Sequence, residues 1–366
     1  MTVDEPVTRV LLLTSGPLDG RRGADIQLAA ALARSLQGLH YYWFRQWPPR
    51  PRSAFELPGR AVPVLSSTGV PGRPERFQAA AVGALLAHRV ELVHAVMTIG
   101  ESFPGFSRMW PRLIGNRPVL HTVPGVMDPQ LLADCRPLGP TVAHSEAAAR
   151  NLHEAGFGEV CVVGPPVPLD RWPMMPRRID GPPVVLVTGH HDPGGGAQDA
   201  IAASGVAVRA GARLRLVLAV RDRPGQNPAR RVEELRAQAA HEGLRDTEVL
   251  GHVEDMGALL AAADILLYLP TVLGAKADIP LTVLEALATG RPVILSELPQ
   301  FVALHDTVLR APLNDPHRTG HLLRQLLERP WWWQHLAEQG RAVVESRFGE
   351  DRFVARYARL YRELLQ

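Results

Sequence analysis

Short runs of apolar residues alternate with segments of helical periodicity along almost the whole chain. Apolar runs without polar alternation are typical of strands in a parallel sheet that is covered on both faces. The expected strands are 10–13, 41–44, 92–96, 119–121, 141–143, 160–163, 184–188, 213–220, 248–250, 265–268 and 292–294. The expected helices are 24–36, 77–88, 129–135, 146–155, 197–210, 229–242, 256–262, 281–287 and 318–327. This repetition predicts α/β domains of the doubly wound, Rossmann-like type.

The pattern falls into two halves, each of which opens with a strand, a glycine-rich loop and a helix. A length of 366 residues exceeds one ordinary core and suits two domains. The segment 165–183 is dense in proline and has no apolar period, so we expect a linker there. We predict a first domain over 1–166 and a second over 167–347. The last helix, within 348–366, is expected to pack back on the first domain.

Two open sheets of this kind are expected to face each other across a cleft. Ligands of open α/β sheets bind beyond the carboxyl ends of the strands, and we therefore place the candidate site there. A single dehydrogenase-like chain is the alternative architecture. It requires a dinucleotide fingerprint after the first strand, and the glycines of residues 14–23 do not have that spacing.

The charge balance gives no support to a nucleic-acid partner. The net charge is +3, from 40 basic and 37 acidic residues. Lys276 is the only lysine among the basic residues, a bias that GC-rich codon usage explains together with 33 prolines and 32 glycines. The two cysteines, Cys135 and Cys161, exclude a disulfide scaffold and a thiolate-rich metal site.

The chain is expected to be cytoplasmic and soluble. Its acidic start lacks the basic and apolar regions of a secretory signal. The longest apolar stretch, 258–273, is interrupted by Asp264 and Pro270, so no bilayer-spanning helix is expected. Arginine and aromatic residues in 43–60 and 106–112 suggest at most peripheral contact with a membrane, and an ordinary surface loop is the preferred interpretation.

Several segments carry motifs in a recognisable order. Residues 280–294, PLTVLEALATGRPVI, are similar to the pattern E-x-x-P-L-x-x-L-E-A-M-A-x-G-x-P-V-I. Further segments match other motifs in chain order. Residues 20–32 match a glycine loop and first helix, 91–94 a D-V-V-H strand, 120–125 an H-D-x-P stretch, 142–156 a V-S segment, 163–172 the hinge P-N-G-V-D-x-x-x-F, and 250–253 an F-L-G-x-V strand end. The ordered set resembles the retaining glycosyltransferases of family four, which have the GT-B fold. The resemblance implies transfer of a sugar from a nucleoside diphosphate to a hydroxyl acceptor.

The second half carries the candidate donor residues. The resemblance implies that the Glu285 carboxylate accepts hydrogen bonds from the ribose hydroxyls and that the backbone near Val253 holds the nucleoside. The glycines Gly194, Gly195 and Gly196 precede an expected helix, so their backbone could approach a diphosphate at the helix N-terminus. The alternative is a flexible turn that binds no ligand, which would have the same three glycines. Gly23, in the first glycine loop, is a further candidate.

Three family positions depart from the pattern. Members of the family carry an arginine and a lysine in G-R-x-x-x-x-K-G, where this chain has His190 and Gly195. The first glutamate of the family motif falls on Ala277. Loss of two cations is costly, because one charge-assisted contact contributes roughly 1.5–3 kcal/mol.

Several residues could compensate for these departures. Lys276, His190 and Arg221 are the candidates for the diphosphate, and Asp278 for the sugar hydroxyls. Exposed loop side chains are the alternative interpretation. Arg21, Arg22 and Arg223 are further loop candidates for an anion.

His94 and His121 end two expected strands of the first half. The resemblance places such residues near the reacting sugar and the acceptor, where a neutral imidazole could accept a proton or hold a hydroxyl. A histidine satisfied at a strand end is the structural alternative. The sequence contains no Asp-x-Asp, and we expect neither a metal nor another cofactor.

The prediction from the sequence is a metal-independent, retaining glycosyltransferase. Its partners would be a nucleotide sugar and a small-molecule or lipid-linked hydroxyl acceptor, and its oligomeric state is open. Because of the three departures, a catalytically silent GT-B-like protein that partners an active transferase is the alternative. An epimerase or a phosphorylase on the same fold is a weaker third hypothesis.

Overall fold

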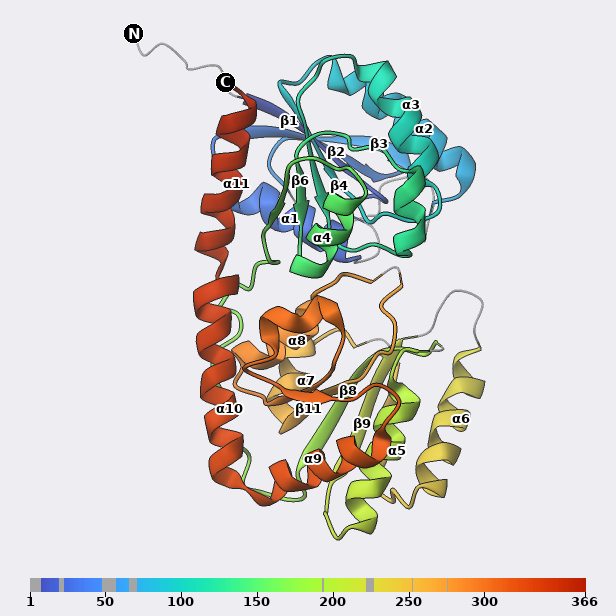
Figure 1. Cartoon of the computed structure of the whole chain (residues 1–366), viewed down its shortest axis with the longest axis vertical. Coiled ribbons are helices and arrows are strands. Elements are labelled where there is room, and N and C mark those ends of the chain that lie inside the picture. The colour runs from blue at the N-terminus through green and yellow to red at the C-terminus, as the bar shows by residue number, and fades with distance from the viewer. Residues whose placement is uncertain are drawn as a thin grey trace. The chain divides into compact units, whose positions relative to one another are not determined.

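A computed structural model describes residues 8–19, 23–47, 57–65, 71–192, 194–221, 227–251, 253–274 and 276–366. Internal contacts divide the chain into two units, which are coloured along the chain in Figure 1. The first unit comprises Met1–Pro166, Gly274–Ile279 and Glu350–Gln366, and the second comprises Val167–Leu273 and Pro280–Gly349. The loop 274–279 therefore groups with the first unit, although we placed it in the second.

The first unit contains a parallel sheet of seven strands in the order β3-β2-β1-β4-β5-β6-β7. The strands are β1 (Thr8–Thr14), β2 (Leu39–Gln46), β3 (Arg60–Leu65), β4 (Leu92–Val96), β5 (Val119–Val123), β6 (Thr141–Ala143) and β7 (Val160–Val162). We did not predict β3, because Pro63 interrupts its apolar pattern. At the edge of the sheet, β3 pairs on one side only, and a proline is tolerated there.

Helices cover both faces of this sheet. They are α1 (Ala24–Ser35), α2 (Arg73–Ala87), α3 (Phe103–Ile114), α4 (Glu146–Glu154) and α11 (Glu350–Leu364), with a 3-10 helix η1 (Pro129–Asp134). One core lies between the sheet and α1 with α11, and a second lies between the sheet and α2 with α3. The helix α3 was not predicted, since Pro111 lies inside it. The helix that we expected at 129–135 is the short η1.

The last helix packs on the first unit, as predicted. Its Phe353, Tyr357 and Tyr361 are buried in the core that α1 also covers. The Tyr357 hydroxyl lies 3.0 Å from the Thr122 hydroxyl. A π-helical turn η3 (Val344–Phe348) and Gly349 separate α11 from α10 (Pro330–Val343).

The second unit contains a parallel sheet of six strands in the order β10-β9-β8-β11-β12-β13. The strands are β8 (Val184–His190), β9 (Arg215–Arg221), β10 (Thr247–Leu250), β11 (Ile265–Tyr268), β12 (Val293–Ser296) and β13 (Leu309–Ala311). The strand order reverses between β8 and β11, which is the topological switch point where open α/β sheets bind ligands. The three-residue β13 was too short to predict from its pattern.

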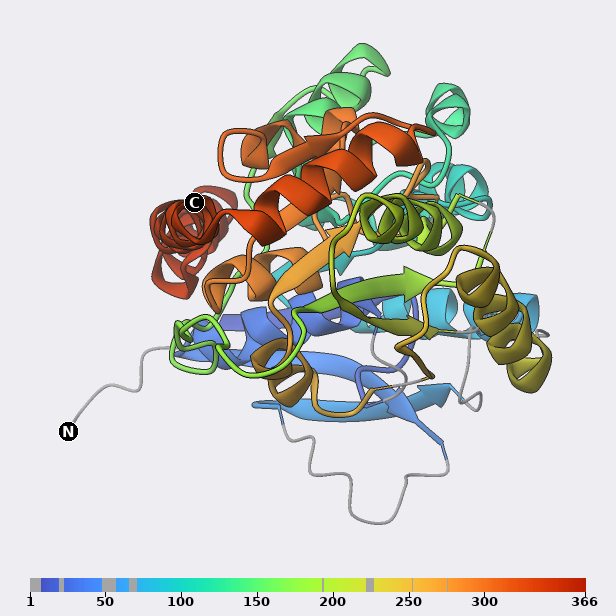
Figure 2. The same ribbon diagram turned by 90° about the horizontal axis from the view of Figure 1, so that it is seen from below.

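The remaining helices of the second unit flank this sheet. They are α5 (Ala197–Arg209), α6 (Pro228–His241), α7 (Met256–Ala262), α8 (Leu281–Ala288), α9 (Pro316–Glu328) and the 3-10 helix η2 (Pro299–Leu304). The helix α9 packs along α5 (Figure 2). In the part of the chain that the structure describes, no helix combines the length and the apolar character needed to cross a membrane. The prediction of two doubly wound α/β domains is confirmed.

The expected linker is in fact packed against the second unit. Met175 donates its backbone N–H to the carbonyl of Thr289 over 3.1 Å, and the Arg291 guanidinium donates to the carbonyl of Pro176 over 3.0 Å. Gly290 has φ +72°, and a Cβ there would lie 3.1 Å from Met174. The proline-dense composition therefore reflects extended chain fixed on a surface, and not a free tether.

Replacement of Tyr357 by alanine tests the docking of α11. Tyr357 is fully buried, its ring centre lies 4.7 Å from that of Phe353, and its hydroxyl bonds to Thr122. We expect Tyr357→Ala to lower the free energy of unfolding by about 3–5 kcal/mol, because it leaves a large cavity. Urea unfolding measures this, with Arg356→Ala on the exposed side of α11 as the matched control. Equal stability of the two variants would contradict the observed packing.

Candidate functional site

The loop after β8 is a tight turn built from the three glycines. Gly194 and Gly196 have φ of +73° and +89°, values that favour glycine. A Cβ on Gly196 would lie 2.3 Å from the carbonyl carbon of Leu269, at the end of β11. The loop thus lies directly against the chain that leaves β11, and it leads into α5, which has no side-chain cap at its N-terminus.

Gly195 lies where the family pattern has its lysine. A Cβ at this position would lie 2.3 Å from the carbonyl oxygen of His190 and 2.3 Å from a carboxylate oxygen of Asp192. Because real Cβ atoms do not approach other atoms so closely, this loop conformation admits no lysine there. The absence of the lysine is therefore linked to the backbone conformation of this loop, and a change of residue 195 alone would not restore the cation.

His190 and Arg221 lie next to each other at the carboxyl edge of the second sheet. The two residues are register partners in the parallel pairing of β8 with β9. The carbonyl of Arg221 also accepts the backbone N–H of His191 over 2.9 Å. An arginine therefore lies on the neighbouring strand at the level where the family pattern has its own arginine, and its exposed guanidinium has no hydrogen bond or ion pair within the described residues.

Glu285 lies half-buried on α8. Its carboxylate has no hydrogen-bond or ion-pair partner in the described part of the chain. Burial raises the pKa of Glu285 to about 7, and the positive charges of Arg171 and Arg221 oppose this shift. A half-buried carboxylate without partners, near two cations, has its hydrogen-bonding capacity left for a ligand.

Arg171 is a site residue that our sequence analysis missed. It is exposed, and its guanidinium makes no hydrogen bond or ion pair among the described residues. The turn that carries it is fixed, because the Arg341 guanidinium donates to the carbonyl of Trp172 over 2.6 Å and to that of Ala288, at the end of α8, over 2.9 Å. The hinge motif allowed this turn to be located in the sequence, but the motif has no required residue at the position of Arg171.

Val253 lies between β10 and α7 and is half-buried. Trp172 packs against the first turn of α7, since a Cβ on Gly257 would lie 3.9 Å from its ring. The Arg171 turn therefore adjoins the start of the helix that follows Val253. Arg223, which we also considered, lies outside the described residues, as do Arg21 and Arg22.

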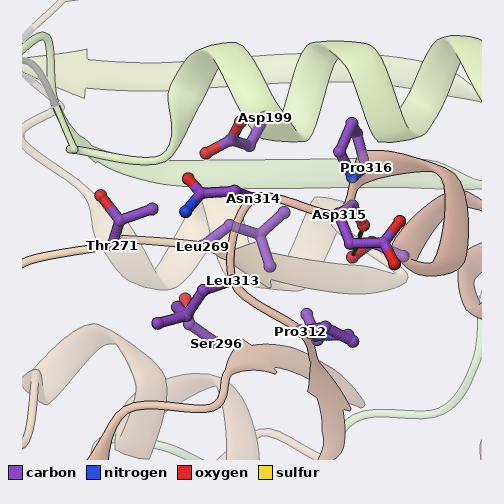
Figure 3. A pocket seen from close by; sticks show the side chains of 11 residues that line it. Asp199, Leu269, Thr271, Ser296, Pro312, Leu313, Asn314, Asp315 and Pro316 are labelled. Atoms are coloured by element: carbon purple, nitrogen blue, oxygen red, sulfur yellow. Dashed lines mark hydrogen bonds between the residues drawn. The ribbon is translucent and has the colours of Figure 1, made fainter.

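A separate pocket lies near the start of α5 and the loop after β13 (Figure 3). Asp199, Thr271 and Asn314 contribute polar side chains, and the Asn314 amide points toward the Asp199 carboxylate (Figure 3). The cavity volume is about 10 Å³, which is room for one water molecule. This pocket is therefore too small for a nucleotide.

In the first unit, Gly23 begins α1. A Cβ there would lie 2.6 Å from a carboxylate oxygen of Asp25, so glycine is needed for close packing. The Asp25 carboxylate accepts hydrogen bonds from the backbone N–H and the hydroxyl of Ser15. The start of α1 thus already holds a buried carboxylate, which makes it a poor place for a phosphate.

His94 has a structural role, which corrects our prediction of a catalytic one. Its side chain is fully buried, and its ring nitrogens form hydrogen bonds of 2.7 Å with the hydroxyls of Tyr361 and Thr122. Burial lowers its pKa to about 3, with a smaller contribution from His121. Both nitrogens are therefore occupied, and none is left for a substrate.

His121 and His144 differ from His94. Both are buried, and the described residues provide no hydrogen bond of ordinary geometry to their ring nitrogens, although the backbone of Met97 lies close enough to His121 to act on its pKa. His121 stacks on Phe103 with ring centres 5.0 Å apart. Burial lowers the pKa of each imidazole to about 4, so both are neutral at neutral pH. The sequence analysis predicted His121 but missed His144, which lies inside the V-S motif segment that we quoted.

Lys276 and Asp278 lie in the loop that groups with the first unit. The Asp278 carboxylate is buried and accepts the Ser145 hydroxyl over 2.7 Å, and its backbone N–H bonds to Pro124. Burial raises its pKa to about 6. The carbonyl of Lys276 lies against Gly125, where a Cβ would come within 2.3 Å. Ser145 thus engages one carboxylate oxygen of Asp278, the residue that we predicted for the sugar hydroxyls.

No three side chains of the metal-ligating types converge among the residues that the structure describes. The sequence-predicted residues thus fall into two groups. Glu285, Arg221, His190, Val253 and the glycine loop belong to the second unit, whereas His94, His121, Lys276, Asp278 and Gly23 belong to the first.

Comparisons with known proteins agree with this fold. Residues 182–329 match the family model described as "Glycosyl transferases group 1". No curated protein matches the sequence. Among solved structures, HepE from Anabaena, crystallised with UDP and glucose, has a TM-score of 0.74 at 14% identity, covering 97% of this chain and 100% of its own.

Two further solved structures have the same fold. Sucrose-phosphate synthase from Thermosynechococcus elongatus has a TM-score of 0.77 at 18% identity, with 98% and 99% of the two chains covered. A UDP-forming α,α-trehalose-phosphate synthase from Burkholderia xenovorans has a TM-score of 0.70 at 12% identity, with 98% and 100% covered. Residues 182–329, less than half of the chain, are therefore similar to group 1 glycosyl transferases, and the chain as a whole shares the two-domain α/β fold of these solved structures.

Proposed function

We propose that the chain transfers a sugar from a nucleoside diphosphate donor to a hydroxyl acceptor, with retention at the anomeric carbon and without a divalent metal. The observation that carries the proposal is Glu285, a half-buried carboxylate near the guanidinium groups of Arg171 and Arg221, three side chains for which the described residues provide no hydrogen bond or ion pair. A carboxylate suits a ribose diol and two guanidinium groups suit a diphosphate. A nucleoside diphosphate presents both.

In the proposed complex, Glu285 accepts hydrogen bonds from the two ribose hydroxyls. An ionised acceptor makes such bonds roughly twice as strong as a neutral one. The backbone around Val253 meets the base. Uridine is the base we infer, because HepE was crystallised with UDP and with UDP-glucose. The likeness to HepE supports this choice only through the shared fold.

The diphosphate is held by a different set of cations from the one in the family pattern. Arg221 reaches it from β9 beside His190, and the unpaired N–H groups at the start of α5 face it. Arg171 adds a second guanidinium from the turn that Arg341 fixes. The number of cations is therefore the same as in the family pattern, with two arginines in place of one arginine and one lysine. Each arginine contributes about 1.5–3 kcal/mol to the binding free energy of the diphosphate.

The acceptor hydroxyl would bind at the carboxyl ends of β5 and β6 in the first unit. Within the described residues, His121 and His144 each keep a neutral imidazole with at least one ring nitrogen that has no hydrogen-bond partner and can donate or accept one hydrogen bond. In the reaction, the bond between C1 of the sugar and the diphosphate oxygen breaks. The acceptor oxygen bonds to C1 on the same face, and its proton passes to the departing diphosphate oxygen. The acceptor is a small molecule or a lipid-linked molecule with a free hydroxyl group.

A catalytically silent protein is the second candidate function. Ala277 replaces the first glutamate of the family motif, and the neighbouring Asp278 is buried with one carboxylate oxygen bonded to Ser145. A silent chain would bind nucleotides or a partner subunit without turnover. Slow release of free sugar from a UDP-sugar, with no acceptor present, distinguishes the two, because only the enzyme cleaves the bond to C1.

Removal of the arginines tests the donor site. We expect Arg221→Ala and Arg171→Ala each to weaken binding of UDP about 10- to 100-fold, because each removes one charge-assisted contact. Binding of uridine should stay within about twofold, since uridine has no phosphate. Isothermal titration calorimetry measures both, and Arg236→Ala on the exposed face of α6 is the matched control. Equal losses for UDP and uridine would remove these arginines from the diphosphate site.

Glu285 gives a prediction for the pH dependence of stability. Because burial raises its pKa to about 7 in the folded state, the folded state favours the protonated form. Protonated Glu285 therefore stabilises the folded state fully below the ordinary pKa of glutamate, and this stabilisation is lost as the pH rises through about 7. We expect Glu285→Gln to gain stability relative to the native chain between about pH 5 and pH 8.

Urea unfolding at each pH measures this difference. Glu233→Gln, on the exposed side of α6, removes the same charge and serves as the control. A stability difference between the native chain and Glu285→Gln that does not change with pH would contradict the burial of this carboxylate.

A further inference from the structure

Arg341, in the last turn of α10, joins two segments of the second unit that are far apart in the sequence. One nitrogen of its guanidinium, Nη1, donates to the carbonyl of Trp172 over 2.6 Å and to that of Ala288 over 2.9 Å. Its Nε donates to the carboxylate of Glu345. The Arg341 side chain is only 18% exposed, so water competes little for these bonds. The two carbonyls are therefore held close together by a single side chain.

These two carbonyls belong to the two parts of the candidate donor site that carry opposite charges. Ala288 is the last residue of α8, one turn after Glu285, and a helix end leaves such a carbonyl without an intrahelical partner. A cation there also interacts favourably with the helix dipole. Trp172 directly follows Arg171 in the chain. Arg341 thus ties the turn that carries Arg171 to the helix that carries Glu285.

The end of α8 has further supports that do not involve the Arg341 guanidinium. Met175 donates its backbone N–H to the carbonyl of Thr289 over 3.1 Å. The helices α8 and α10 pack against each other (Figure 1), and a Cβ on Gly340 would lie only 2.7 Å from the Leu287 side chain. Because of these contacts, we expect α8 to keep its place when the guanidinium is removed.

The turn of Arg171 depends more strongly on Arg341. The Arg171 N–H donates to the carbonyl of Pro168 over 3.0 Å, so the turn is closed on itself. The Trp172 ring lies near Gly257 at the start of α7, but such apolar packing is not directional. The bond from Arg341 to the Trp172 carbonyl therefore fixes the direction in which the turn presents its arginine.

We propose that Arg341 is a positioning residue for the donor diphosphate, because it holds the Arg171 guanidinium where one nucleoside diphosphate reaches both Arg171 and Glu285. This inference rests on the proposed function, in which Glu285 binds the ribose and Arg171 the diphosphate. Arg341 itself touches no substrate, since its Nη1 and Nε atoms are engaged within the protein. It matters nonetheless, because a misplacement of about 1 Å at a binding group can cost up to about 100-fold.

A double-mutant cycle with Arg171 tests the proposal. Arg341→Met keeps the apolar stem of the side chain and removes its donors. We expect it to weaken UDP binding about 5- to 50-fold in the native chain, but less than about twofold in the Arg171→Ala chain, because it acts through Arg171. Uridine binding should change less than about twofold in both chains, since α8 keeps its other supports. Isothermal titration calorimetry measures all four affinities.

Arg347→Ala is the matched control. Arg347 lies in η3, and its guanidinium also donates to a backbone carbonyl, that of Ala303, over 2.9 Å. This variant should bind UDP like the native chain. Arg341→Lys keeps the charge and one donor nitrogen, so it should lose less affinity for UDP than Arg341→Met. The same cycle is run with Arg341→Lys if Arg341→Met does not fold.

Three results would overturn the proposal and leave the proposed function standing. They are an unchanged affinity for UDP in the Arg341 variants, a loss of equal size for UDP and uridine, and a loss as large in the Arg171→Ala chain as in the native chain. A fourth result bears on the proposed function itself. If Arg171→Ala alone leaves UDP binding unchanged, Arg171 does not hold the diphosphate, and both proposals fail together.

Discussion

The parallel pairing of β8 with its two neighbours, β9 and β11, is the constraint on which the candidate donor site depends. Parallel strands end at one edge of the sheet, so the chains that leave them gather there. The pairing brings Arg221 into register with His190. It also brings the glycine loop against Leu269 so closely that no side chain fits at Gly196. The chemistry of the site is thus set by backbone geometry before any side chain is considered.

The charges around Glu285 follow from the same geometry. The family pattern holds its diphosphate with an arginine and a lysine near the glycine loop, and neither is present. Here, one guanidinium lies on the adjacent strand and another on a turn fixed by Arg341. A cation that arrives from a neighbouring element can act on the same phosphate, because the field depends on position and not on the order of residues in the chain. We therefore regard the departures from the motif as a rearrangement of the cations.

The sequence allowed the two-domain α/β fold to be predicted because apolar runs buried on both faces are unambiguous when they repeat. It did not allow β3 and α3 to be predicted, since Pro63 and Pro111 interrupt their patterns while tertiary packing stabilises them. Glu285 could be chosen as a candidate because it lies within a long motif. Arg171 could not, because its role depends on a fixed turn.

The histidines show the same limit of sequence reasoning. His94 and His121 are the middle residues of the neighbouring strands β4 and β5 and look alike in the sequence. The structure separates them, because the hydroxyls of Tyr361 and Thr122 occupy both nitrogens of His94, whereas those of His121 have no hydrogen bond of ordinary geometry within the described residues. Tyr361 is 267 residues away from His94 in the chain, so no local pattern could reveal this contact.

A crystal structure of the chain with bound UDP is the most direct test of the central claim. The account predicts that the Glu285 carboxylate bonds to the ribose hydroxyls, and that the guanidinium groups of Arg171 and Arg221 lie within hydrogen-bond distance of the diphosphate. A diphosphate bound away from both arginines would contradict the account. So would crystals in which the nucleotide does not bind to the second unit at all.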